Sequence, residues 1–200
     1  MLLKLNIKSF LLLFLLCLFL EIGTEEISVR LTLPWVSLVY NIIFCVFAFI
    51  LIRPYNWPES LSVTEKERRL IASRRHKVIA LIFIFAWFGL FFWIISVLDM
   101  PAVNAWYMIV PALPAAFGEE LLYKGILFKY LHQERRWNFW LSAILVSMVF
   151  ALYHRQFNLT FVKHIIWSLY SFLIYYHCRS LILVGLFHYF HNLAFYFWIP

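Results

Sequence analysis

The sequence predicts an all-α protein, a polytopic transmembrane bundle of about seven helical spans in a single membrane domain, residues 1–200. Hydrophobic residues make up 64% of the 200 residues, against roughly 45–50% in soluble proteins. Aromatic residues make up 21%, which is more apolar surface than a soluble domain of this length buries. The apolar residues also fall in runs near the length, about 20 residues, that crosses a bilayer as a helix.

The first span is Leu5–Ile22. Lys4 and Lys8 precede its apolar run, as in a signal peptide, but the residues at its end, Glu21-Ile22-Gly23-Thr24, are not a small-residue cleavage site. We therefore expect it to be retained. The next two spans, Leu33–Ile52 and Val78–Leu98, have the required length. The remaining four are shorter, longer or more polar: Ala102–Leu131, Trp137–His154, Phe161–Tyr176 and Leu181–Ile199.

The distribution of lysine and arginine predicts the orientation. With seven spans, most of these residues fall on the side that holds the N-terminus, the polar loop 53–77 and the turn at Gln133–Arg136. By the positive-inside rule the N-terminus is cytoplasmic and the C-terminus external. The basic loop 53–77 then lies at the anionic inner leaflet, as a topology determinant or a surface helix. The formal net charge of +7 is explained by this asymmetry, and no nucleic-acid partner is predicted.

Two adjacent carboxylates, Glu119 and Glu120, interrupt the fourth span in the segment GEELLYKGIL. Charges at the bilayer centre cost about 2.5–3.5 kcal/mol on insertion scales, so both must face the bundle interior or a cavity. Neighbours on a helix point about 100° apart and cannot share one role. Glu120 stands four positions before Lys124, the favourable order for a helical ion pair, which leaves Glu119 to face a reaction partner. A purely structural ion pair is the alternative.

Histidines on two later spans strengthen the functional interpretation. His154 ends the fifth span, and His188 and Asn192 share one face of the seventh because they are at i and i+4. His191 is rotated away from that face and is a poorer partner. The remaining histidines lie at span edges, where an interfacial role is expected: His76, His132, His164 and His177.

The three patterns in this order, E-E-x-x-x-basic, F-x-x-x-H and H-x-x-x-N, resemble those of the CPBP (Abi) family of intramembrane proteases. This family includes the CAAX prenyl endopeptidases and bacteriocin-processing or immunity proteins. The resemblance covers a core of about residues 102–197. It differs at one position, because the first family motif usually ends in arginine and this chain has Lys124. Lysine keeps the charge but loses the bidentate geometry of arginine.

The resemblance implies an intramembrane endopeptidase that hydrolyses a peptide bond in a membrane-associated peptide or lipidated protein tail, of CAAX type or bacteriocin-leader type. It implies that Glu119 and His154 activate a water, that Glu120 and Lys124 brace them, and that His188 and Asn192 stabilise the oxyanion. The cofactor stays open between none and a zinc ion. If a metal is required, the resemblance implies Glu119, His154 and His188 as its ligands. It places the protein in the plasma (inner) membrane of a bacterium.

Two alternatives remain open. A non-catalytic peptide-binding or bacteriocin-immunity protein could keep the same bundle and use its cavity for capture. A small proton-coupled transporter could use the buried carboxylates and His154 as a relay, although the sequence has no detectable inverted repeat, which such transporters often contain.

Overall fold

The computed structural model describes residues 15, 38–39, 41–46, 48, 74–98, 109–154 and 157–198. The predicted span Leu5–Ile22, apart from Leu15, and the loop 53–73 lie outside these residues. The described part of Leu33–Ile52 is helical. Every regular element in the described ranges is a helix, which confirms the predicted all-α class.

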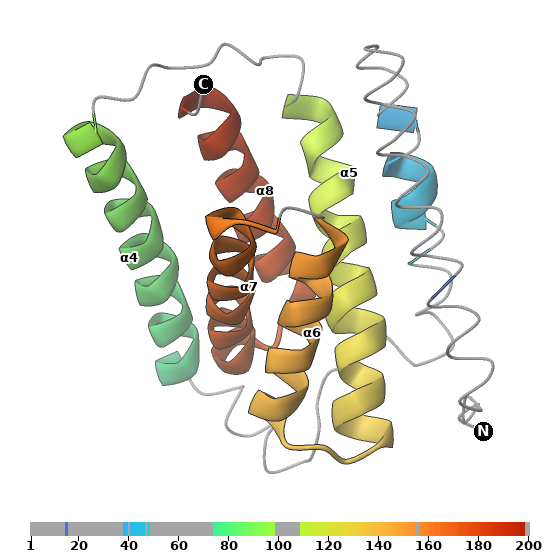
Figure 1. Cartoon of the computed structure of the whole chain (residues 1–200). Coiled ribbons are helices and arrows are strands. Elements are labelled where there is room, and N and C mark those ends of the chain that lie inside the picture. Colours follow the sequence, from blue (N-terminus) through green and yellow to red (C-terminus); the bar gives the residue numbers. More distant parts are fainter. Residues whose placement is uncertain are drawn as a thin grey trace.

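In the described ranges 74–98, 109–154 and 157–198, five helical segments form an antiparallel bundle (Figure 1). They are α4 (Arg74–Leu98), α5 (Ile109–Glu120) with its continuations η4 (Leu121–Phe128) and η5 (Tyr130–Glu134), α6 (Phe139–Tyr153), α7 (Leu159–Cys178) and α8 (Leu181–Trp198). Consecutive segments run in opposite directions. The start of α4, the α5–α6 turn and the α7–α8 turn therefore share one end of the bundle (Figure 1).

The observed helices follow the predicted spans with shifted ends. Helix α4 begins at Arg74 rather than Val78, so the last four residues of the predicted loop 53–77 form its first turn. Long basic side chains permit this because their stems cover apolar surface while their charges stay in a polar medium. Helix α7 extends two residues beyond Phe161–Tyr176 at each end. Within the described residues, only Arg75–Ile94 forms a helix that is both long enough and apolar enough to cross a membrane. Two shorter apolar helices, Phe139–Tyr153 and Leu181–Ala194, accompany it.

The segment that follows the two glutamates is wound more widely than an α-helix. Leu121–Phe128 and Tyr130–Glu134 form π-helical turns, a conformation that is rare and concentrated at functional sites. The chain then reverses through Arg136, whose φ is 58°. Asn138 caps α6, where its side-chain oxygen accepts from the backbone N–H of Trp140 at 2.9 Å. This is the turn that the sequence predicts near Gln133–Arg136.

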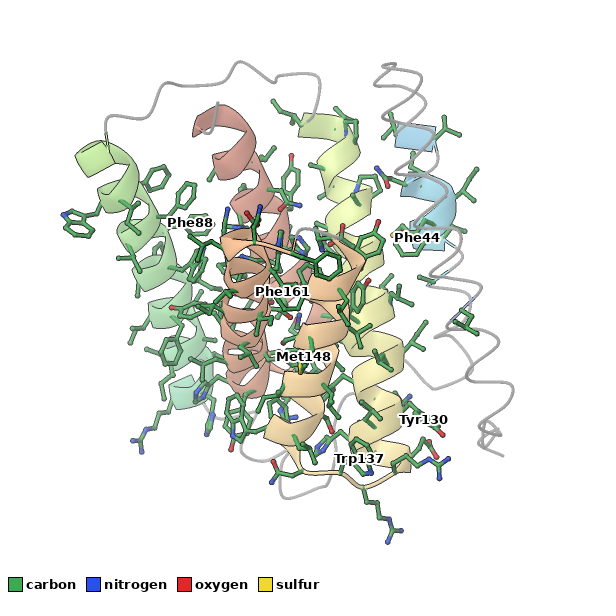
Figure 2. All side chains as sticks on the ribbon, viewed as in Figure 1. Phe44, Phe88, Tyr130, Trp137, Met148 and Phe161 are labelled. Atoms are coloured by element: carbon green, nitrogen blue, oxygen red, sulfur yellow. The ribbon has the colours of Figure 1, made fainter. Side chains whose placement is uncertain are left out.

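Two glycines allow close helix contacts around the glutamates. A Cβ on Gly118 would lie 2.4 Å from the ring of Phe44, and Phe44 lies between the 41–46 helical segment and α5 (Figure 2). A Cβ on Gly185 would lie 2.9 Å from the ring of Phe117. Helices α5 and α8 pack along much of their length. Because Gly118 and Gly185 have no side chains, Phe44 can pack closely on α5, and α8 can pack closely on Phe117 of α5.

Candidate active site

The buried charge of the bundle is centred on Glu120. Its Oε2 lies 2.6 Å from Nζ of Lys124, one turn later, and both side chains are 3% exposed. Lys124 also lies over the ring of Phe172 at 4.5 Å. The structure thus confirms the predicted ion pair. The ring of Phe172 on α7 adds a cation–π contact to the lysine, which lacks the bidentate geometry of an arginine.

His188 joins α8 to both glutamates. Its Nδ1 donates to Oε1 of Glu120 at 3.0 Å, and its Nε2 lies 3.6 Å from Oε2 of Glu119. Glu119 is 16% exposed against 3% for Glu120. The two carboxylates therefore differ as expected, with Glu120 enclosed and Glu119 closer to open space. The sequence did not predict that His188 would contact Glu120, because Lys124 already accounted for that carboxylate.

His154 is held at the end of α6. Its Nδ1 donates to the carbonyl oxygen of Phe150 at 2.9 Å, which leaves Nε2 as the acceptor of the neutral ring. Its ring stacks on His164 of α7, with centroids 4.2 Å apart and planes 24° apart. Phe150 lies between this pair and His188, with ring centroids 4.6 Å from His154 and 6.3 Å from His188. Phe150 thus connects the histidine of α6 with that of α8, while no direct contact of His154 with either glutamate is seen among the described residues.

The aromatic wall of the site comes from α7 and α4. Trp167 is buried, and its ring lies 4.4 Å from His188 and 5.1 Å from His191. Trp87 of α4 donates from Nε1 to Nδ1 of His191 at 3.2 Å. His191 is therefore a buried member of this wall (7% exposed), although its rotation away from the face of His188 and Asn192 made it the poorer partner in the sequence. Asn192 is half-buried on α8, one turn after His188.

Sequence reasoning missed His164 and Trp167. The sequence places His164 at the membrane interface; in the structure it is half-buried and its ring stacks on His154. A signal was present: His164, Trp167, Ser168 and Ser171 recur at helical spacing, which marks one inward face of α7. The serine of this face at position 168 accepts from Ser147 of α6 at 2.9 Å, so the face is confirmed as an interior one.

The residues do not fit a metal centre in this arrangement. Among the described residues, no group of three or more His, Cys, Asp or Glu side chains is placed to hold a metal ion. The three residues that the resemblance implies as ligands, Glu119, His154 and His188, therefore do not form such a group. His154 is directed towards Phe150 and His164, and Nδ1 of His188 is already bonded to Glu120.

Comparison with known proteins gives one match. Residues 101–194 match the family model described as type II CAAX prenyl endopeptidase Rce1-like. This range contains all three motifs, and it confirms the resemblance inferred from them. No curated protein and no solved structure matches the chain.

Proposed function

We propose that this protein is an intramembrane endopeptidase, because residues 101–194 match the family model described as type II CAAX prenyl endopeptidase Rce1-like, a family of membrane proteases. Its substrate is a peptide bond in a membrane-associated peptide or lipidated protein tail. The observation that carries the proposal is the contact of His188 with both Glu119 and Glu120. It brings two of the family motifs to one buried point.

Glu119 is the proposed general base. It is the more open of the two carboxylates, and a carboxylate in a site poor in water is a competent proton acceptor. It takes one proton from a water molecule while the water oxygen adds to the carbonyl carbon of the substrate. His154, whose Nε2 is the acceptor of the neutral ring, assists in orienting that water. The proton then passes to the leaving nitrogen as the C–N bond breaks, so protons and charge balance.

His188 and Asn192 are the proposed donors to the oxyanion. Their positions at i and i+4 place them on one face of α8, and His188 is fixed by its bond to Glu120. Fixed donors in an enclosed site stabilise developing negative charge strongly.

Glu120 and Lys124 are proposed as positioning residues. Glu120 connects α5 to His188, and Lys124 neutralises Glu120. This chemistry requires only a water molecule and the residues named. The described side chains of the site do not fit a metal ion, and no metal ion takes part in the proposed steps.

We further propose seven spans in a bacterial plasma membrane, with a cytoplasmic N-terminus. Supporting this, the basic residues at the start of α4, in the α5–α6 turn and at Arg179 share one end of the bundle (Figure 1). Reporter fusions after Arg75 and after Pro200 test it. The first should be cytoplasmic and the second external; both on one side would contradict the seven-span arrangement.

The activity is tested with purified protein in liposomes and a library of peptide tails, prenylated and unmodified, with and without a chelator. Cleavage that survives the chelator supports the proposal as written. Cleavage abolished by the chelator would contradict the metal-free step. If no tail is cleaved, the peptide-binding or immunity alternative is favoured over the enzyme.

A further inference from the structure

One side chain in the aromatic wall of the site comes from outside the three motifs. Trp167 lies on α7, which contributes none of them. It is 4% exposed and is surrounded by site residues: its ring stacks on Phe150 at 5.5 Å and on His191 at 5.1 Å, and it lies 4.4 Å from His188. Trp167 therefore contacts elements from both α6 and α8 at the level where the motifs meet.

The indole N–H of Trp167 is an unsatisfied donor. Nε1 is buried and has no hydrogen-bond partner among the described residues. Buried tryptophans usually place this group on an acceptor, and Trp87 does so by donating to His191. A buried donor without a partner is destabilising. A phenylalanine at position 167 would keep an aromatic ring in this wall without that cost, so the N–H group itself requires an explanation.

A substrate would supply the missing acceptor. In a peptide, each residue carries a carbonyl oxygen, and in an enclosed apolar site that oxygen also needs a donor. Because Trp167 adjoins His188, a peptide whose scissile carbonyl is held by His188 brings neighbouring carbonyls within reach of α7. The orphan donor and the incoming acceptor are complementary.

We propose that Trp167 is a substrate-binding residue whose indole N–H donates to a backbone carbonyl of the bound peptide, next to the scissile bond. This inference rests on the proposed function. It adds a substrate contact from α7 to those of the three motif-bearing helices, and because this contact is with the peptide backbone it is independent of the side chains of the substrate.

The test is kinetic, with Trp167→Phe in liposomes and a peptide that the wild type cleaves. Because the contact binds substrate and transition state alike, KM should rise about three- to tenfold, the worth of one neutral hydrogen bond, while kcat stays within about twofold. A structural defect would instead lower the active fraction, and with it kcat. Ser171→Ala is the matched control, since Ser171 lies one turn along the same helix and its buried Oγ also has no hydrogen-bond partner among the described residues; its KM should not change.

A spectroscopic readout makes the result independent of turnover. In protein labelled with ¹⁵N-tryptophan, the indole signal missing from Trp167→Phe identifies residue 167. It should move when a hydroxyethylene analogue of the cleaved peptide is added. An unchanged KM in Trp167→Phe, or an unmoved indole signal, would overturn the assignment while leaving the protease intact. Failure of the wild type itself to cleave any tail would instead overturn the proposed function, and this inference with it.

Discussion

Nδ1 of His188 lies 3.0 Å from Oε1 of Glu120, a contact between residues 68 positions apart. It joins α8 to the end of α5 and, through the ion pair of Glu120 with Lys124, to the π-helical segment that follows. The pair of glutamates is thereby divided. Glu120 is held between Lys124 and His188, and Glu119 is the more exposed of the two.

The first prediction concerns Lys124. Lys124→Met leaves Glu120 buried without its cation, and breaking a buried pair costs about 3–5 kcal/mol. We expect a large fall in thermal stability in detergent, together with loss of activity. Lys124→Arg restores the residue usual in the family, keeps the charge and should retain the fold. A Lys124→Met protein as stable and active as the parent would show that the ion pair is dispensable.

The second prediction concerns the close contact of α5 with α8. Gly185→Ala introduces a Cβ 2.9 Å from the Phe117 ring, so the ring or the helices must shift; overpacking of this kind costs about 1–3 kcal/mol. Stability and cleavage should both fall, because the same contact aligns His188 with the glutamates. Gly89→Ala is the control, since nothing lies within 4 Å of its Cβ. Equal effects of the two substitutions would contradict this role.

The third prediction is a pH dependence at the end of the bundle that holds the start of α4 and the α7–α8 turn. Nδ1 of His177, just beyond the predicted span Phe161–Tyr176, lies 3.1 Å from Nδ1 of His76 on α4. Partial burial, then the neighbouring His76 and Arg179, lowers the pKa of His177. A group with a lowered folded-state pKa favours folding above its unfolded value, about 6.5, and loses that contribution as pH falls through the folded value.

We therefore expect the melting temperature to decrease as pH is lowered from 7.5 to 5. The decrease should be smaller in His177→Phe, which keeps the ring that stacks on Phe83. An identical pH profile in the variant and the parent would exclude His177 as its origin.

The fourth prediction concerns Asn192. If its amide donates to the oxyanion, Asn192→Ala should lower kcat by about 10²–10³-fold with little change in KM. Asn192→Asp keeps the shape but replaces the donor with an acceptor, so its kcat should be no higher than that of Asn192→Ala. The measurement is steady-state cleavage in liposomes, with circular dichroism to verify the fold. Full activity in Asn192→Ala would remove this residue from the catalytic group.

Much of the site could be predicted from the sequence because charges are rare inside apolar runs. Glu119, Glu120 and Lys124 were conspicuous there, and i to i+4 spacing was sufficient to pair Glu120 with Lys124. The turn at Gln133–Arg136 was predictable from its polarity. These features depend on local spacing, which a sequence displays directly.

Contacts between helices were harder to predict from the sequence. The bond from His188 to Glu120 depends on the depth at which α8 packs on α5, and Gly185 and Phe117 set that depth. The sequence places His164 at a span edge and makes His191 a poorer partner, because one helical wheel gives a direction but not the neighbouring helix. Trp167 was overlooked because tryptophan is common in a chain with 21% aromatic residues, and only its position beside His188 distinguishes it.

The central claim, that Glu119 is the base of a peptidase, is tested most directly by comparing wild type and Glu119→Gln in the same liposomes with the same peptide. Glutamine keeps the shape and hydrogen bonding but cannot accept the proton. Cleavage should fall by about 10²–10⁴-fold, while binding of the uncleaved peptide persists. Equal cleavage by the two proteins would contradict the assignment.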